Sequence, residues 1–423
     1  MDKKGIFIGI DYSDDCCQAC YFNERHAKAE SVFGLQGSLR YLIPTRLCLK
    51  RETGQWLIGD EAEEYSDSTG SPLYTELLYH TLMEDSFEED GNVFISEDLL
   101  AIYIRKILEL VSLSSGSSMI AQVNIAVRNA DLETKQAMER AFKRIGIDPS
   151  KLHLISYDES FAFFILHEDR QLWANGSLLF DFSGDGFYVK RLSLVYGGGQ
   201  EIIYMEEDDL SARFSIRDLN SDVLRLRLDE RLNELYESLK SDGANSSVYF
   251  TGDGFDDIWF TETIKNISAT RRAFRGNNIY AKGACLKGLI ECVQEGSPVI
   301  AGSRSTKAAV SVEYLYKGRP KETVIVPAAE DWYEAAGSID LILDETKTVD
   351  LMVTSLIGRQ QTIISFELSS FPDRPPKTTR VRVDVRYISE HECEICITDL
   401  GFGDFYKASG KEVRKILDLG GYI

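Results

Sequence analysis

The sequence predicts an α/β region followed by a β-sandwich, and three observations support this fold class. Through about residue 300, short apolar runs alternate with amphipathic segments, as is typical of α/β architecture. Two of the apolar runs, 6–11 and 178–181, end in the acids Asp11 and Asp181 and lead into turns. After residue 305, seven short strand-like runs follow one another with little helix, which indicates a separate β-sandwich.

The elements of the first region follow from apolar spacing and capping residues. Residues 6–11 are expected to form a buried strand, and 16–22 the returning strand of a hairpin. Ser96 is expected to cap a helix whose apolar residues recur at helical spacing, and Asp131 to cap a second helix that ends at Gly146. Further strands are expected at 123–127, 152–156, 178–181 and 248–251, and further helices after 156, over 215–240 and around 282–285.

The second region is expected to contain only strands and turns. The strands are predicted at 310–315, 323–326, 339–343, 349–353, 362–368, 381–388 and 392–398. The boundary is placed near 301–305, so the expected domains are 1–302 and 306–423. A chain of 423 residues is long enough for two or three domains.

The net charge of −21 limits the classes of partner. A surface this acidic repels phosphate backbones and anionic lipids, so neither nucleic acid nor a membrane surface is expected as a partner. No run of about 18 apolar residues predicts a membrane span. The first residues lack the long apolar segment of a signal peptide, and we therefore expect a cytoplasmic protein.

The eight cysteines predict neither zinc nor disulfides. Cys17 and Cys20, like Cys393 and Cys396, have the spacing of paired zinc ligands, but both pairs lie in strand-like runs without histidine partners or turn glycines. Disulfides are rare in a reducing compartment. We interpret the cysteines as small apolar residues of the core.

Residues 177–190 have the pattern of a phosphate-binding turn that carries an extra acid. The apolar run 178–180 stops at Asp181, the turn Ser183-Gly184-Asp185-Gly186 follows, and an apolar strand then resumes. In such a turn the backbone N–H groups face an anion and the acid reaches the metal cation or its water. The carboxylate of Asp185 opposes a bare phosphate at this position.

The order of these pieces resembles the actin/sugar-kinase/heat-shock superfamily, and specifically a divergent DnaK-type heat-shock chaperone. Residues 9–11 and 180–187 match the two phosphate loops, and 250–254 match the adenosine loop. The segments 44–62, 123–163 and 281–284 match the family in order, and 364–372 is similar to the entry of its peptide-binding β-domain.

The resemblance implies a two-lobed, actin-like ATPase fold built from ribonuclease-H-like repeats. It implies a reduced adenine-side subdomain, because residues 189–249 replace a much longer segment. It also implies a C-terminal β-sandwich that resembles the chaperone's peptide-binding domain but lacks a full helical lid.

The resemblance further implies the residues of an ATP site. Asp11, Asp181 and Asp158 would be catalytic in a working ATPase, with Asp11 and Asp181 holding Mg²⁺ through water and Asp158 or Glu159 positioning the attacking water. The nucleotide contacts would come from residues in and beside the phosphate and adenosine loops, namely Ser13, Gly184, Asp185, Gly186, Gly252, Gly254 and Phe255.

Several departures from the family pattern weaken the ATP chemistry. Asp14, Asp15 and Asp185 add negative charge to the phosphate loops. No lysine lies between Lys50 and Lys106, where the family has its catalytic lysine, and Tyr188 replaces an acid.

We therefore favour a chaperone-like protein that binds a polypeptide segment or a partner protein through its β-domain, with weak or no ATP hydrolysis. The alternative is a working Mg²⁺-ATPase of the heat-shock type with rearranged catalytic residues. A third hypothesis, a structural scaffold, is opposed by the net charge, which disfavours self-association.

Overall fold

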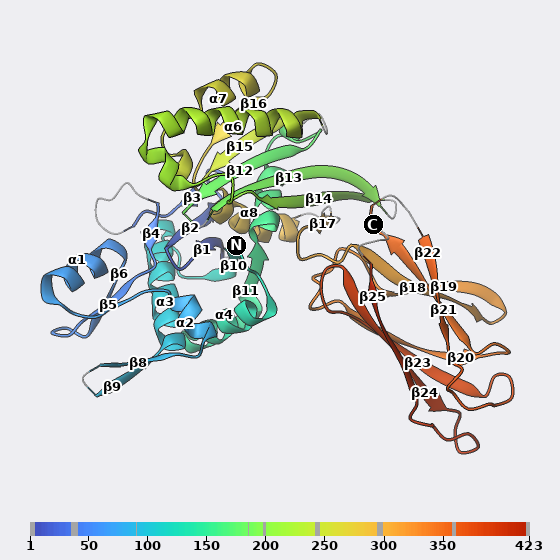
Figure 1. Cartoon of the computed structure of the whole chain (residues 1–423). Coiled ribbons are helices and arrows are strands. Elements are labelled where there is room, and N and C mark those ends of the chain that lie inside the picture. Colours follow the sequence, from blue (N-terminus) through green and yellow to red (C-terminus); the bar gives the residue numbers. More distant parts are fainter. Residues whose placement is uncertain are drawn as a thin grey trace. The chain divides into compact units, whose positions relative to one another are not determined.

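The structure is a computed structural model that describes residues 5–34, 41–89, 91–184, 186–197, 200–241, 246–293, 299–357 and 361–419. The chain forms two compact units (Figure 1). The first comprises Met1–Ser193 and Met205–Ser297, and the second comprises Leu194–Tyr204 and Pro298–Ile423.

One mixed sheet of the first unit is built around strand β1 (Ile6–Tyr12). β1 is antiparallel to β2 (Cys16–Asn23) and parallel to β10 (Ile120–Val127). β11 (Leu152–Ser156) continues the parallel side, and β3 (Lys28–Ser31) and β4 (Ile43–Pro44) both pair with β2. Asp11 therefore lies near the carboxyl end of a central, buried strand.

A second mixed sheet repeats this arrangement around β12 (Ser177–Ser183). β12 is antiparallel to β13 (Gly186–Gly197) and parallel to β15 (Ser247–Thr251), and β16 (Arg272–Arg275) continues the parallel side. β14 (Gln200–Asp209) lies beside β13, and its first half, within the second unit, pairs with β17 (Val299–Ala301). Asp181 thus takes the position in this sheet that Asp11 takes in the other.

Helices connect and cover the sheets of the first unit. They are α1 (Gly59–Thr69), α2 (Leu77–Leu82), α3 (Ser96–Ser115), α4 (Leu132–Arg144), α5 (Tyr157–His167), α6 (Asp222–Ser241), α7 (Thr261–Ser268) and α8 (Ile279–Val293). Short strands β5 (Leu47–Lys50), β6 (Gln55–Ile58), β7 (Leu73–Tyr74), β8 (Ser86–Glu89) and β9 (Asn92–Ile95) complete the unit. Within the described ranges, no helix combines the length and apolar character needed to cross a membrane.

Helix α8 lies directly on β1, β2 and α5 because glycines form the contacts. A Cβ atom on Gly9 would lie 2.1 Å from the carbonyl oxygen of Ala281, and one on Gly283 would lie 1.8 Å from that of Ser160. These distances are shorter than any van der Waals contact, so both positions require glycine. The close approach places the first residues of α5 and α8 beside each other.

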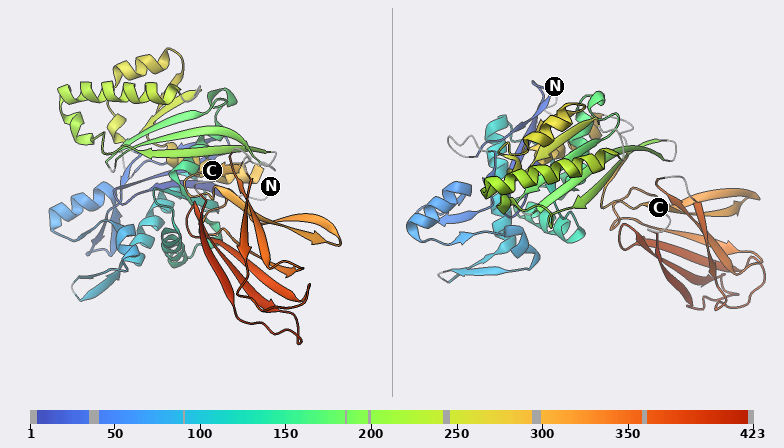
Figure 2. Two further views of the ribbon diagram at one scale, coloured as in Figure 1. Left: turned by 45° about the vertical axis from the view of Figure 1, so that its right-hand side comes forward. Right: turned by 45° about the horizontal axis from the view of Figure 1, so that its top comes forward.

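The second unit contains two four-stranded antiparallel sheets, drawn in orange and red in Figure 2. One has the order β19-β18-β21-β22 and the other β20-β23-β24-β25. Their bounds are β18 (Ala308–Tyr316), β19 (Arg319–Val326), β20 (Ala336–Leu343), β21 (Thr348–Ser355), β22 (Gln361–Glu367), β23 (Thr379–Tyr387), β24 (Glu392–Gly401) and β25 (Glu412–Asp418). Alternate side chains of both sheets, such as Val353 and Ile395, share one apolar core.

Two capping predictions had different outcomes. The cap at Asp131 is confirmed, because its carboxylate accepts a hydrogen bond from the backbone N–H of Thr134 at 2.8 Å. The cap at Ser96 is wrong: α3 already begins at Ser96, whose hydroxyl donates to the carbonyl oxygen of His80 at 3.0 Å.

The charged helix expected from 215 starts only at Asp222, after a short 3₁₀ turn.

Candidate functional site

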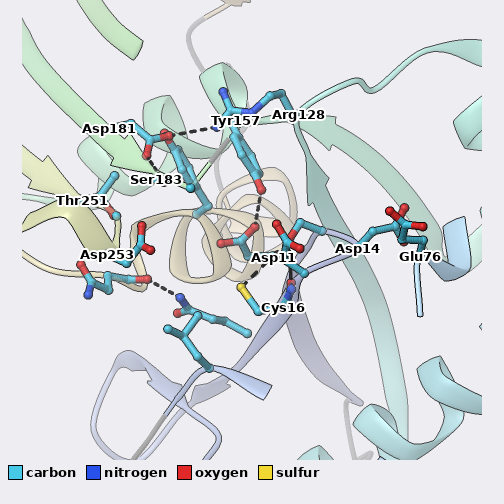
Figure 3. Close-up of a pocket in the computed structure, with 18 residues that line it drawn as sticks. Asp11, Asp14, Cys16, Glu76, Arg128, Tyr157, Asp181, Ser183, Thr251 and Asp253 are labelled. Atoms are coloured by element: carbon cyan, nitrogen blue, oxygen red, sulfur yellow. Dashed lines mark hydrogen bonds and ion pairs between the residues drawn. The ribbon is translucent and has the colours of Figure 1, made fainter. Parts of the chain in front are cut away.

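A pocket of about 570 Å³ lies in the first unit, where the central strands of its two sheets end (Figure 3). Asp11 lines it from β1 and Asp181 from β12, and Thr251 lines it at the end of β15. Of the described residues around it, six are acids and one is an arginine, and none is a lysine. The acids are Asp11, Asp14, Asp15, Glu76, Asp181 and Asp253, and the arginine is Arg128.

The structure brings together about half of the predicted site residues. Asp11, Ser13, Asp181, Gly184 and Gly252 line the pocket. Four others do not line it, namely Asp158, Gly186, Gly254 and Phe255. Asp185 lies outside the described residues.

Asp158 and Phe255 are held away from the pocket by their own partners. Buried Asp158 accepts a hydrogen bond from the ammonium group of buried Lys190 at 2.8 Å, and Lys190 also pairs with Glu207. Asp158 therefore balances an internal cation instead of positioning a water molecule. Phe255 belongs to the apolar core of the second sheet, where its ring stacks on Trp259 at 5.8 Å between centroids. The expected roles of both residues are not compatible with these positions.

Two tyrosines connect the core acids. The hydroxyl of Tyr157, at the start of α5, donates to Asp11 at 2.8 Å, and that of Tyr280, on α8, donates to Asp181 at 2.8 Å. Their rings stack at 4.0 Å with an interplanar angle of 4°. Burial raises the pKa of both phenols well above the ordinary value, so both remain protonated donors at neutral pH.

Arg128 supplies the cation nearest to Asp181. Its guanidinium lies 3.4 Å from the carboxylate of Asp181 and 3.8 Å from the ring centroid of Tyr188. Arg128, Tyr157 and Tyr280 are not among the site residues predicted from the sequence. A usable signal existed for Arg128, because it directly follows β10, and the carboxyl ends of β10 and β1 meet at the same edge of one sheet.

Residues 28–301 match the C-terminal model of a family of unknown function, DUF5716. The chain belongs to the DUF5716 family. Residues 305–419 match a domain of unknown function, DUF8552. No curated protein matches the sequence. The matches define two regions of the chain and assign an activity to neither.

The outer wall of the pocket adds further negative charge. The carboxylate of Asp14 accepts hydrogen bonds from the backbone N–H groups of Leu78 and Tyr79, at 2.8 and 3.0 Å. Burial raises the pKa of Asp14 above the ordinary value. Burial also raises the pKa of the Cys16 thiol to about 12, so the one cysteine that lines the pocket among the described residues is a neutral thiol and not a nucleophile.

The residues of the pocket do not fit Mg²⁺-ATP well. Phosphoryl transfer needs cationic groups on the phosphates, and Arg128 already contacts Asp181. Asp11 and Asp181 each accept a tyrosine hydroxyl, which competes with metal-bound water for the same oxygen atoms. In the described part of the chain, no three His, Cys, Asp or Glu side chains are placed to hold one metal ion.

Proposed function

We propose that this protein is a chaperone-like binding protein. Its first unit would have an actin-like fold with a degenerate nucleotide site, and its β-sandwich would bind a polypeptide segment or a partner protein. The repeated strand order around β1 and β12 supports the two-lobed fold. The main observation against ATP hydrolysis is the stacked pair Tyr157–Tyr280. The hydroxyls of this pair donate hydrogen bonds to the two core acids.

Electrostatics of the pocket support the same proposal. Like charges about 4 Å apart repel by roughly 1 kcal/mol in water and by several times more in a sheltered site. Among the described lining residues, a triphosphate would meet six carboxylates and a single guanidinium. The pocket therefore opposes the binding of a bare nucleotide, and none of the described residues that line it is a lysine.

Strand β22 supports binding of an extended segment by the β-sandwich. β22 lies at the edge of its sheet and pairs with β21 on one side. On the opposite side of the sandwich, the start of β20 lies against β19, because a Cβ on Gly337 would lie 2.1 Å from the carbonyl oxygen of Ile325 in β19. Extended peptides add to open sheet edges through main-chain hydrogen bonds. Ile363, which is 64% exposed on β22, offers an apolar contact for such a peptide.

The first test is ATP turnover by the purified full chain with Mg²⁺. We expect no hydrolysis above a protein-free control, and the same result for Asp181→Asn and Tyr280→Phe. Calorimetric titration with Mg²⁺-ATP at high micromolar concentration should give no saturable heat. Hydrolysis at the rate of a working chaperone, abolished by Asp181→Asn, would overturn the proposal and favour the alternative, a working Mg²⁺-ATPase with rearranged residues.

The second test is peptide binding at β22. Fluorescence anisotropy of the full chain with a labelled, leucine-rich heptapeptide should show saturable binding. Ile363→Lys should weaken it on the order of tenfold, because a lysine on an edge strand blocks strand addition. Ile342→Lys is the matched control, since Ile342 is a similarly exposed isoleucine on β20, a strand of the other sheet whose start lies against β19. Equal losses in the two variants, or no binding by the unaltered chain, would count against the proposal.

A further inference from the structure

We infer that one face of the β-sandwich docks a basic amphipathic helix of a partner protein. The face is the outer side of the sheet β19-β18-β21-β22, whose strands are labelled in Figure 1. It is formed by the side chains that point away from the apolar core shared with the other sheet. The inference rests on the proposed function, because it names a kind of partner for the same β-sandwich, and it concerns a surface other than the edge of β22.

An apolar row crosses this outer face. Cross-strand pairing places one residue of each strand in the row, in the order Val324, Ser311, Met352 and Ile363. Val324 and Ile363 are each more than half exposed, and Met352 is half-buried. Neighbouring strands lie about 4.8 Å apart, so the row is roughly 14 Å long. Exposed apolar side chains that lie in a row, and are not scattered singly, are typical of an interaction surface.

A row of acids lies beside the apolar row, two residues further along the strands. Glu322 of β19 pairs directly with Glu313 of β18, and Asp350 lies at the same level on β21. None of these three acids, nor Glu367 at the end of β22, forms an ion pair with a described residue. Like charges directly opposite each other destabilise a sheet. A cationic partner would relieve this repulsion, so the charge of the face is complementary to lysine and arginine.

The outer face of the other sheet shows that the sandwich does not leave its surface acids unpaired everywhere. On that face Asp340 pairs with Arg382 at 2.9 Å, and Glu394 pairs with Arg386 at 2.9 Å. Both pairs join residues that are directly opposite on neighbouring strands. The two outer faces therefore differ in the arrangement of charge, and the difference is local and does not follow from the net charge of the chain.

The exposed isoleucines of the other sheet do not form a row. Ile342 lies on the edge strand β20 and pairs with Arg380, and Ile416 lies on the opposite edge strand β25 and pairs with Glu394. Each of these isoleucines therefore has a charged residue as its neighbour across the sheet. Among the described residues, the combination of an apolar row and unpaired acids belongs to the face of β19-β18-β21-β22.

The chemistry of the face favours a helix over an extended segment. Strands β18 and β21 pair with a neighbour on both sides, so a partner that lies on the face meets side chains only. An extended segment would leave its own N–H and C=O groups without partners against the apolar row, whereas a helix satisfies these groups internally. Apolar residues at helical spacing would cover the row, and lysines or arginines beside them would pair with the acids.

The test is fluorescence anisotropy of the full chain with a labelled peptide of about 14 leucine and lysine residues, in which the leucines have helical spacing. We expect saturable binding that weakens when the salt is raised to molar concentration, because exposed ion pairs are screened. The same peptide with glutamate in place of lysine should not bind. No saturable binding of the lysine peptide at high micromolar concentration, or equal binding of the glutamate peptide, would overturn the inference.

Variants of the acids locate the site. One variant neutralises three acids of the face, namely Glu313→Gln, Glu322→Gln and Asp350→Asn. A control variant neutralises three ion-paired acids of the other sheet, namely Asp340→Asn, Glu394→Gln and Glu412→Gln. The first should weaken the helical peptide on the order of tenfold, because each exposed charge pair contributes a few-fold. The control changes the net charge equally and should leave the affinity unchanged. Equal losses would indicate nonspecific attraction and contradict the inference.

Variants of the apolar residues test the other half of the face. Val324→Thr combined with Leu315→Thr should weaken the helical peptide on the order of tenfold, because the partner would bury both side chains. Threonine keeps the preference for a strand, and both positions are exposed, so the sandwich should still fold. Ile342→Thr combined with Ile416→Thr is the control on the other sheet and should change little. An unchanged affinity in the first variant would refute the role of the apolar residues.

Two further peptides separate this inference from peptide binding at the edge of β22. The variant with three neutralised acids should bind the leucine-rich heptapeptide as the unaltered chain does. Loss of the helical peptide alone would overturn this inference alone, and loss of the heptapeptide alone would overturn edge binding alone. A leucine–lysine peptide of strict alternation favours a strand. If it bound more tightly than the helical peptide and needed the same three acids, the assignment of a helix would be wrong.

Discussion

Replacing Arg374 by leucine should destabilise the β-sandwich strongly. Its guanidinium makes two parallel hydrogen bonds to the carboxylate of Asp399, at 2.6 and 2.8 Å, with side chains 5% and 0% exposed. Asp399 also accepts from the backbone N–H groups of Gly401 and Ser409. The pair therefore holds the base of the connection between β24 and β25. The variant leaves a buried carboxylate without its cation.

The magnitude follows from the burial of the pair. Removing one partner of a buried ion pair costs about 3–5 kcal/mol. The two backbone donors that remain on Asp399 favour the lower end, about 3 kcal/mol. For a unit of this size, each kcal/mol lowers Tm by roughly 3–4 °C, so we expect a loss of about 10 °C in the transition of the second unit.

The stability that the Arg374–Asp399 pair contributes should depend on pH. Burial alone would raise the pKa of Asp399, but the hydrogen bonds from Arg374 and Ser409 outweigh it and hold the pKa far below the ordinary value. A carboxylate with a depressed pKa contributes stability above its unfolded pKa of about 3.9 and loses it as the pH falls towards the folded value. The difference between the unaltered chain and Arg374→Leu should therefore be full at neutral pH and shrink in strong acid.

Differential scanning calorimetry measures the effect, and hydrogen exchange of β23 and β24 assigns the transition. Arg382→Leu is the matched control, because Arg382 makes a similar pair with Asp340 at 2.9 Å, with side chains 48% and 37% exposed. An exposed pair is worth about 0–1 kcal/mol. Equal losses for the two variants, or a loss below about 1 kcal/mol for Arg374→Leu, would refute the reasoning from burial.

Three further predictions concern single side chains. Lys190→Met should lower the free energy of unfolding, measured by chemical denaturation, by about 3–5 kcal/mol, since it leaves the buried carboxylate of Asp158 without this cation. Adding Asp158→Leu to this variant should recover part of the lost stability. Gly283→Ala should prevent stable folding, measured as the yield of soluble protein, because its Cβ would meet the carbonyl oxygen of Ser160. Gly276→Ala should fold, because the nearest atom to its Cβ would be Oδ1 of Asn278 at an ordinary contact distance of 4.0 Å. Phe405→Ala, at a side chain 94% exposed, should change Tm by no more than about 1–2 °C.

Most strands of the β-sandwich could be predicted from the sequence, because the residue pattern that indicates a strand lies within the strand itself. The seven strands expected between 310 and 398 are confirmed as β18 to β24, and the alternation of more and less buried residues is clearest in β21 to β24. β25 was missed because Leu417 is its one fully buried residue, so its seven residues carry almost no alternation. The cap at Ser96 failed for a related reason: its hydroxyl has a partner in His80, far from the first turn of α3 in the chain.

The candidate site shows where sequence reasoning stops. The acids Asp11 and Asp181 end buried strands, and each strand end is visible from its own neighbours in the chain. The hydroxyls bound to them come from Tyr157 and Tyr280, which are 146 and 99 residues away in the sequence. No local pattern links residues at such separations.

The sequence by itself determined most of the sandwich strands, the acids that end β1 and β12, and the negative charge of the chain, because periodicity acts over a few residues and composition needs no fold. Only the tertiary structure decided what those acids contact. The packing of α8 on α5 through Gly283 places the two tyrosines between the acids, and the pairing of Lys190 with Asp158 keeps one predicted catalytic acid out of the pocket. Both depend on contacts between distant segments, and these contacts turn the pattern of a phosphate site into an acidic, tyrosine-bridged pocket.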